Sequence, residues 1–186
     1  MTTDAVTVPP TPTVEDLIVR AAITDVLQRY VRGIDRFDLA VVRSCYHPDA
    51  YDDHNSYRGP ASGFVEWLEP RLGRHAATTH FLSESLVRRT AEDIAQSDCM
   101  AVVHQVSPLD EAGQRTVVVE GLRYLDRFER RDGSWLIAHR KVAVDWRYVL
   151  TVGAEGGPPF PDHFRAGRRD RMDASYEEVG PSPTTA

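Results

Sequence analysis

Apolar residues recur at helical spacing through residues 14–35. With about 100° between successive residues, they form one stripe that includes Tyr30, and Asp35 falls at its edge, where the helix should end. Thr13 precedes this run and Asp16 follows Thr13 by three positions, which resembles a capping box at a helix start. The pattern predicts an amphipathic helix that brings Tyr30 and Asp35 towards the protein interior.

Two shorter helices and then a run of strands are expected after this helix. The helices are expected at about 39–46 and 60–74, with a short strand over 51–57 between them. Four long strand-like stretches follow, separated by turn residues, at about 78–90, 94–108, 115–130 and 134–149. Asp132-Gly133, between the last two stretches, is a strong hairpin signal. Helices first and a meander of strands afterwards indicate an α+β fold.

The length of 186 residues fits one domain, which we expect over 14–150. Residues 1–13 are rich in Thr and Pro and are expected to be disordered. Residues 151–186 turn to Gly, Pro and charge and are expected to form a polar tail, with a short basic cluster at 168–171 that is interpreted as solvated surface. We expect this tail to contact a neighbouring subunit or to act as a lid.

Charge, hydropathy and cysteine content argue against a nucleic-acid-binding, membrane-spanning or secreted protein. The net charge is −6 with no clustered basic surface, so no nucleic-acid partner is expected. No run approaches the roughly 18 apolar residues of a membrane span, and residues 1–12 lack the basic and apolar segments of a secretory signal. Cys45 and Cys99 are too few for a disulfide framework. A soluble cytoplasmic protein without a membrane partner is the expectation.

Sequence motifs for metal and nucleophile chemistry are missing. The seven histidines form no H-x-H or H-E-x-x-H motif, and the two cysteines lack ligand spacing. The adjacent Asp52, Asp53 and His54 are the nearest approach to a ligand cluster. No Gly-rich loop opens a helix, and no G-x-S-x-G motif is present. We therefore expect neither a metal nor a serine nucleophile.

Alternation along the expected strands places basic groups on apolar faces. Side chains at every second position share a face of a sheet. His104 shares its face with Met100 and two valines, and Arg140 shares its face with a run of apolar residues. His80 alternates with leucines, although the opposite face of its strand is apolar too. We expect these three groups to point into the concave side of a curved sheet, beneath the first helix.

An Asp beside a His would make this pocket catalytic. A carboxylate fixes the tautomer of the imidazole and raises the basicity of its other nitrogen, as a general base near neutral pH requires. A Tyr hydroxyl can hydrogen-bond a substrate carbonyl and stabilise an enolate. Asp35, His80 and Tyr30 therefore suit removal of a proton next to a carbonyl, although Tyr30 could be plain core and Asp35 could merely end its helix.

The other candidates have structural interpretations as well. His104 could be a satisfied core residue, because a single His on an apolar face usually is. Arg140 could pair with Glu120 or Asp145. When several polar groups that break the apolar pattern lie in one pocket, a functional site is favoured over these structural interpretations.

From Val14 to Tyr148 the sequence resembles the SnoaL-like branch of the nuclear-transport-factor-2-like superfamily. The matching segments are Tyr30–Asp38, Tyr46–His54, Thr79-His80, Gly121–Gly133, Trp135–Arg140 and Asp145-Trp146. The resemblance implies a cone-shaped α+β barrel in which three N-terminal helices pack on a curved, mainly antiparallel sheet. It also implies a homo-dimer or homo-trimer and no metal or organic cofactor.

Within this superfamily the motifs are closest to those of scytalone dehydratase and bile-acid 7α-dehydratase. A Tyr five residues before an Asp matches Tyr30 and Asp35, and the catalytic His of an early strand matches His80. The resemblance implies that His80, held by Asp35, removes a proton while Tyr30 or His104 orients the carbonyl or assists the leaving group. The candidate substrate-binding residues are His104, Arg140, Tyr51, His54, Trp67, Phe81 and Met100.

The expected function is that of a cofactor-independent lyase. It would carry out a dehydratase-type elimination on a small apolar carbonyl compound such as a steroid or a polyketide. An isomerase or polyketide cyclase using the same pocket remains an alternative, as does a non-catalytic ligand-binding protein, because the fold hosts many activities. Product mass separates elimination from isomerisation, since only elimination loses a group.

Overall fold

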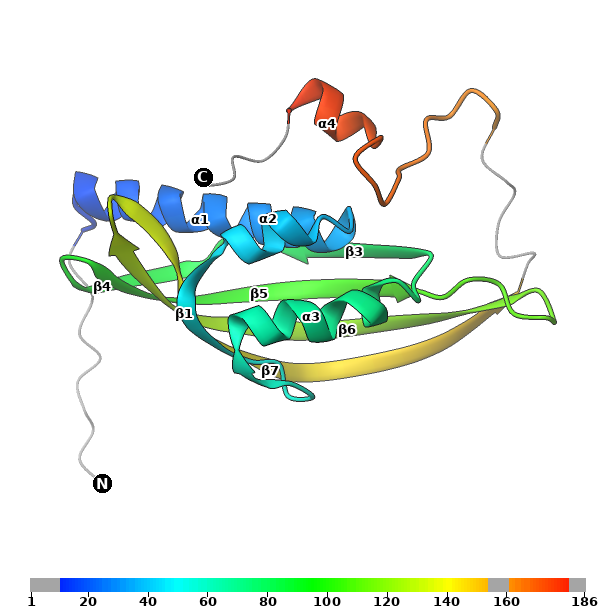
Figure 1. Cartoon of the computed structure of the whole chain (residues 1–186), viewed down its shortest axis with the longest axis horizontal. Helices are drawn as coiled ribbons and strands as arrows, with labels where there is room; N and C mark the ends of the chain where they lie inside the picture. The colour runs from blue at the N-terminus through cyan, green and yellow to red at the C-terminus, as the bar shows by residue number, and fades with distance from the viewer. Residues whose placement is uncertain (1–10, 154–160, 181–186) are drawn as a thin grey trace.

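The structure, a computed structural model, describes residues 11–153 and 161–180 and packs helices on a curved sheet (Figure 1). The helices are α1 (Val14–Asp35), α2 (Leu39–Ser44) and α3 (Ala61–Leu72), with a short α4 (Ala174–Glu178) after the sheet. The strands are β1 (Tyr46–Asp53), β2 (Arg58–Pro60), β3 (Ala77–Leu82), β4 (Leu86–Ala91), β5 (Ile94–Val106), β6 (Gln114–Arg131) and β7 (Ser134–Gly153). The predicted α+β fold, with three helices on a curved sheet, is confirmed.

The seven strands form one sheet in the order β2-β1-β7-β6-β5-β3, with β4 also paired to β5. Every pair is antiparallel except β1 with β7. β3 and β4 pair with different parts of β5, so the single stretch expected at 78–90 is two strands with a break at 83–85. Asp132 and Gly133 have φ of 51° and 79°, the left-handed conformation that their hairpin requires.

The N-terminus of α1 is capped as the sequence predicts. The side-chain oxygen of Thr13 accepts the N–H of Asp16 at 3.2 Å, and the Asp16 carboxylate accepts the N–H of Thr13 at 2.9 Å. The helix ends at Asp35, which is 8% exposed, and Phe37 then takes φ of 56° to turn the chain towards α2. This turn fixes Asp35 at the edge of the core.

The two faces of β5 differ in burial. Its odd-numbered residues, such as Cys99 and Val103, face the helices and are buried, whereas Met100 on the other face is 58% exposed. The register shifts between β6 and β7, next to Gly121 and Phe128, each place one extra residue on β7 and so interrupt its alternation. Residues of β7 with the same parity therefore lie on opposite faces before and after each shift.

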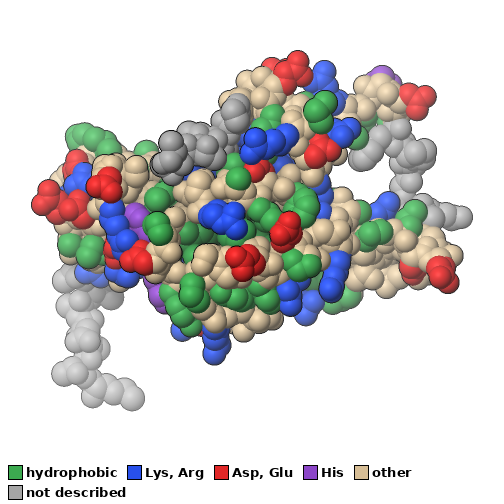
Figure 2. All heavy atoms as spheres, viewed as in Figure 1, with side chains coloured by type: hydrophobic (Ala, Val, Ile, Leu, Met, Phe, Trp, Pro, Cys, Tyr) green, Lys and Arg blue, Asp and Glu red, His purple; other side chains and the backbone are tan. Residues whose placement is uncertain are grey.

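The described surface carries charges of both signs, and the two thiols are buried. Acidic and basic side chains lie interspersed on the face that Figure 2 shows, in keeping with the modest net charge of −6. Within the described residues, no helix combines the length and the apolar character needed to cross a membrane. Cys45 and Cys99 are buried free thiols, and burial raises the pKa of Cys45 to about 11, so it remains protonated at neutral pH.

Residues 161–180 fold back over α1 and α2, on the side away from the sheet (Figure 1). The Tyr176 hydroxyl donates to Asp38 at 3.0 Å, and Arg32 donates to the Gly180 carbonyl at 2.8 Å. β7 runs to Gly153, and the rest of the expected N-terminal segment and tail, residues 1–10, 154–160 and 181–186, lies outside the described residues. The described part of the tail thus contacts the end of the helix that carries Asp35.

Asp173 joins several segments of this tail through hydrogen bonds, and replacing it should make the tail more accessible to protease. Its carboxylate accepts the N–H of Arg168 at 2.8 Å and of Ser175 at 3.0 Å, lies 3.5 Å from Arg36, and through these contacts has its pKa lowered to about 2. The contribution is complete above pH ~4, the ordinary range of an Asp, and is lost as the pH falls towards 2. We expect Asp173→Ala to speed trypsin cleavage after Arg168 at neutral pH, measured by mass spectrometry. Cleavage no faster than in the exposed control Asp162→Ala would contradict this role.

Candidate active site

A cavity of about 490 Å³ lies between α1, α3 and the concave face of the sheet. Its apolar and aromatic lining consists of Tyr30, Ile34, Phe64, Trp67, Leu68, Leu72, Val103, Leu122 and Tyr124. Its polar lining consists of His54, Ser56, Arg71, His75, His80, Gln105 and Glu120. The volume falls within the ~300–1,000 Å³ of small-molecule sites. The cavity can therefore hold one medium-sized, largely apolar molecule.

His80 on β3 and Asp35 at the end of α1 meet at the wall of this cavity. His80 Nδ1 lies 2.7 Å from Asp35 Oδ1, and the backbone N–H of His80 donates to Asp35 Oδ2 at 2.9 Å. The carboxylate therefore holds both the ring and the backbone of His80. With Nδ1 bound to a carboxylate, the neutral ring carries its proton on Nδ1 and keeps the lone pair of Nε2 free. Nε2 is then the atom able to remove a proton.

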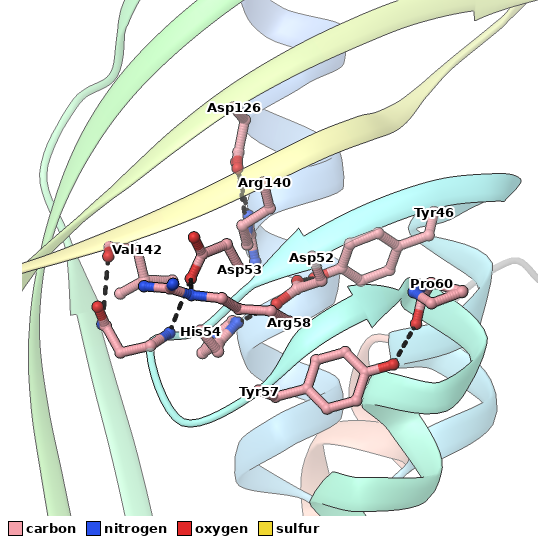
Figure 3. Close-up of polar contacts among 11 residues, drawn as sticks. Tyr46, Asp52, Asp53, His54, Tyr57, Arg58, Pro60, Asp126, Arg140 and Val142 are labelled. Carbon is pink, nitrogen blue, oxygen red and sulfur yellow. Dashed lines mark hydrogen bonds and ion pairs between the residues drawn. The ribbon is translucent and has the colours of Figure 1, made fainter.

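Arg140 lies behind the cavity rather than in its lining, in contact with the rings of two tyrosines. Its guanidinium donates to Asp126 through Nε at 2.8 Å and Nη2 at 2.6 Å, and its carbon lies 4.1 Å and 4.2 Å from the ring centres of Tyr30 and Tyr124. Figure 3 draws Arg140 reaching Asp126 from the neighbouring strand. Burial opposes its charge, but the attraction of Asp126 and of the tyrosine hydroxyls outweighs it and raises the Arg140 pKa. The partner is thus Asp126, not Glu120 or Asp145.

Three buried tyrosines gather around this guanidinium. Tyr30 packs edge-on against Tyr46 and Tyr124, with ring centres 6.0 Å and 5.8 Å apart. Burial raises the pKa of all three hydroxyls, against the opposing effect of Arg140. They therefore remain protonated at neutral pH and can act as hydrogen-bond donors. Of the three tyrosines, Tyr30 and Tyr124 line the cavity.

His54 and Asp52 form a second imidazole–carboxylate pair at the cavity (Figure 3). His54 Nδ1 lies 2.5 Å from Asp52 Oδ1, and the Tyr46 hydroxyl donates to Asp52 Oδ2 at 2.7 Å. Asp52 is fully buried, while the His54 side chain is 20% exposed and stacks on Phe64 with ring centres 4.3 Å apart. Asp52 is therefore held within the protein, whereas the His54 ring is fixed by stacking and remains accessible from the cavity.

The cavity brings together some of the residues singled out in the sequence. Tyr30, His54, Trp67 and His80 line it, and Asp35 lies directly behind His80. Trp67 stands on α3 with the Arg71 guanidinium 3.8 Å from its ring centre. These residues come from two helices, one strand and the turn after β1, so their proximity depends on the fold.

Other candidates lie on the outer face of the sheet. His104, Met100 and Phe81 share that face: Phe81 is 62% exposed and packs edge-on against His104, with ring centres 6.1 Å apart. Tyr51 is 42% exposed and stacks on His139. The expectation that His104 and Met100 point into the cone is wrong because both faces of β5 are apolar, and the buried face is the one with odd numbers.

The sequence pattern does not predict several residues that line the cavity, although the pattern along β6 contains a signal for one of them. Tyr124 shares its face of β6 with Leu122, Asp126 and Phe128. A carboxylate at Asp126 on this apolar face is as unusual as the guanidinium at Arg140, and pairing the two would have been the natural inference. Nothing in the spacing pointed to the tight Asp52–His54 contact, because it forms in a turn.

Two further observations complete the chemistry of the site. Burial, together with Arg169 and Arg74, lowers the pKa of His75, so this lining residue is neutral at neutral pH. Among the described residues, no group of three or more His, Cys, Asp or Glu side chains has the geometry to hold a metal ion.

A family model described as the SnoaL-like domain matches residues 15–141, well over half of the chain. The chain belongs to the SnoaL-like domain family. The resemblance seen in the sequence is therefore confirmed, and this fold family includes dehydratases, dehydrochlorinases and isomerases. No curated protein matches the chain.

Several solved structures share the fold of this SnoaL-like protein. A hexachlorocyclohexane dehydrochlorinase, LinA Type2, superposes with a TM-score of 0.64 at 19% identity, covering 81% of this chain and 99% of its own. A protein proposed to be a scytalone dehydratase from Novosphingobium aromaticivorans gives 0.62 at 15% identity, covering 77% and 97%. The Kfla4162 protein from Kribbella flavida gives 0.61 at 21% identity, covering 69% and 92%. At these identities the likeness concerns the fold.

The buried ion pair behind the tyrosines should dominate the stability of this domain. Asp126→Ala leaves the Arg140 guanidinium buried without its partner, which costs about 3–5 kcal/mol in comparable cases. We expect a loss of this size in the free energy of unfolding measured by urea titration. The control Asp145→Ala removes an exposed partner of Arg123 and should change stability little. A similar small loss in both variants would contradict this prediction.

Proposed function

We propose that this protein is a cofactor-independent lyase that eliminates a group from a small apolar carbonyl compound. The observation that carries the proposal is the contact between His80 Nδ1 and Asp35 Oδ1 at 2.7 Å in the wall of a largely apolar cavity. His80 Nε2 removes the proton next to the carbonyl. Tyr30 or Tyr124 donates a hydrogen bond to the carbonyl oxygen as it gains negative charge.

The surroundings of the pair support this chemistry over a purely structural role. A structural His–Asp pair needs no cavity beside it, whereas His80 lines one of about 490 Å³. Apolar walls exclude water from the reacting atoms and strengthen the interaction between base and substrate. Isomerisation and cyclisation begin with the same proton removal, so the choice among them depends on whether the substrate carries a leaving group.

Removal of the imidazole provides the test of this proposal. The probes are scytalone, a hydroxylated oxo-steroid, and the aldol adduct of acetone and benzaldehyde, with products followed by mass spectrometry. We expect at least one probe to lose water, and His80→Ala to lower that rate by at least ~10²-fold. His139→Ala, whose ring stacks on Tyr51 outside the cavity, should keep the wild-type rate. Near-normal turnover by His80→Ala would rule out the general base.

We further propose that the protein forms a homo-oligomer through the outer face of its sheet. Met100, Trp146 and Tyr148 are 58%, 41% and 61% exposed on this face. Trp146 and Tyr148 lie side by side, with ring centres 5.3 Å apart, and their cross-strand partners on β6 pair in turn with β5. Arg123, at the edge of this patch, pairs with acidic side chains, so a second copy can meet both signs of charge.

A charge placed in this patch should dissociate the oligomer. We expect Tyr148→Glu to sediment as a 20.9 kDa monomer, because a buried unpaired carboxylate opposes association, whereas the wild type sediments as a dimer or trimer. Leu17→Glu, at an apolar position of α1 that is 52% exposed, is the matched control and should retain the wild-type assembly. A monomeric wild type, or an unchanged Tyr148→Glu variant, would contradict the proposed interface.

A further inference from the structure

The Asp52–His54 pair lies on a different wall of the cavity from Asp35–His80. His54 follows β1 and His80 stands on β3, and in the sheet β7, β6 and β5 separate these two strands. Both rings nevertheless line the same cavity. A substrate in the cavity therefore meets two imidazoles, each oriented by its own carboxylate.

The geometry of His54 leaves one of its two ring nitrogens, Nε2, free to face the cavity. Its Nδ1 is turned to Asp52, which is fully buried, and its ring is fixed by stacking on Phe64. The accessible part of the side chain is consequently the opposite edge, which carries Nε2. The described residues show no hydrogen-bond partner for Nε2. When the ring takes up a second proton, that proton lies on Nε2, directed at the cavity, where it can be donated to a bound substrate.

The surroundings of the two carboxylates differ in a way that separates the roles of their imidazoles. Asp35 interacts with the charge of Arg169 from the tail, as well as with His80. Asp52 is fully buried between the Tyr46 hydroxyl and His54, and Arg140 is already paired with Asp126. A buried carboxylate needs a proton donor or a cation close by, and the basic side chain in contact with Asp52 is His54.

We propose that His54, positioned by Asp52, is the general acid that protonates the leaving group while His80 acts as the base. This assignment rests on the proposed lyase function and refines its substrate class to β-hydroxy carbonyl compounds. Hydroxide is a poor leaving group and needs a proton as the carbon–oxygen bond breaks, whereas chloride or a carboxylate leaves without one. A dedicated acid is therefore of use in loss of water and of little use in loss of such anions.

The step balances in atoms and charge. His80 Nε2 takes the proton from the carbon next to the carbonyl, and that electron pair forms the carbon–carbon double bond. The carbon–oxygen bond breaks with its electron pair remaining on oxygen, which receives the proton of His54 Nε2 and departs as water. His80 ends protonated and His54 neutral, still bound to Asp52 through Nδ1, and exchange with solvent restores both rings.

Two probes that differ only in the leaving group test this assignment. The first is the aldol adduct of acetone and benzaldehyde, which loses water, and the second is its acetate ester, which loses acetate to give the same enone. A third measurement, uptake of deuterium from heavy water next to the carbonyl, reports on His80 alone. His54→Gln and Asp52→Asn are compared with His80→Ala and with His139→Gln, an equivalent change outside the cavity.

We expect His54→Gln and Asp52→Asn to lower loss of water by at least ~10²-fold while leaving loss of acetate and deuterium uptake near the wild-type rates. Retention of these two activities also shows that the variants fold. His80→Ala should lower all three rates, and His139→Gln none. Equal losses with both leaving groups in His54→Gln, or no loss with either, would overturn the assignment of the acid but leave the base intact. A wild-type protein inactive in all three measurements would overturn the lyase function and the assignment with it.

Discussion

The ion pair between Arg140 and Asp126 is the constraint on which the interior of this protein depends. A guanidinium without exposure to water is tolerable only with a carboxylate in close contact, and Asp126 provides it from the adjacent strand. The rings of Tyr30 and Tyr124 lie 4.1 Å and 4.2 Å from the guanidinium carbon, so α1, β6 and β7 meet at one point. That meeting point is also the floor of the cavity, and the position of its tyrosines follows from the ion pair beneath them.

Around this floor, each buried carboxylate has a cationic or basic partner of its own. Asp126 has Arg140, Asp35 has His80, and Asp52 has His54. Local pairing of these three carboxylates avoids uncompensated negative charge beside the cavity, which a low-dielectric interior would not tolerate. It also leaves one nitrogen of each imidazole unused by the protein. The same requirement that stabilises the core therefore leaves two imidazole edges available at the cavity.

The sequence predicted the framework of the site better than its lining. The helical stripe placed Asp35 at the end of α1, and the family resemblance identified His80, because both depend on local pattern. Strand parity failed for His104 because β5 is apolar on both faces, one packed on helices and the other exposed. Register shifts between β6 and β7 invert the alternation along β7, as at Trp146, which lies on the outer face over Gly121. Such shifts depend on neighbouring strands and leave no mark in spacing.

The fastening of the tail to Asp38 and Arg32 has a consequence for the order of events during synthesis. α1 leaves the ribosome before the sheet, whereas residues 168–180, which bind the end of α1, follow the entire sheet. Chains emerge from the N-terminus and fold as they do so. The segment around Asp35 therefore acquires its last contacts only after every strand has been made. A nascent chain with a complete sheet would still lack the contacts that hold the end of α1 beside the cavity, until residues 168–180 have been made.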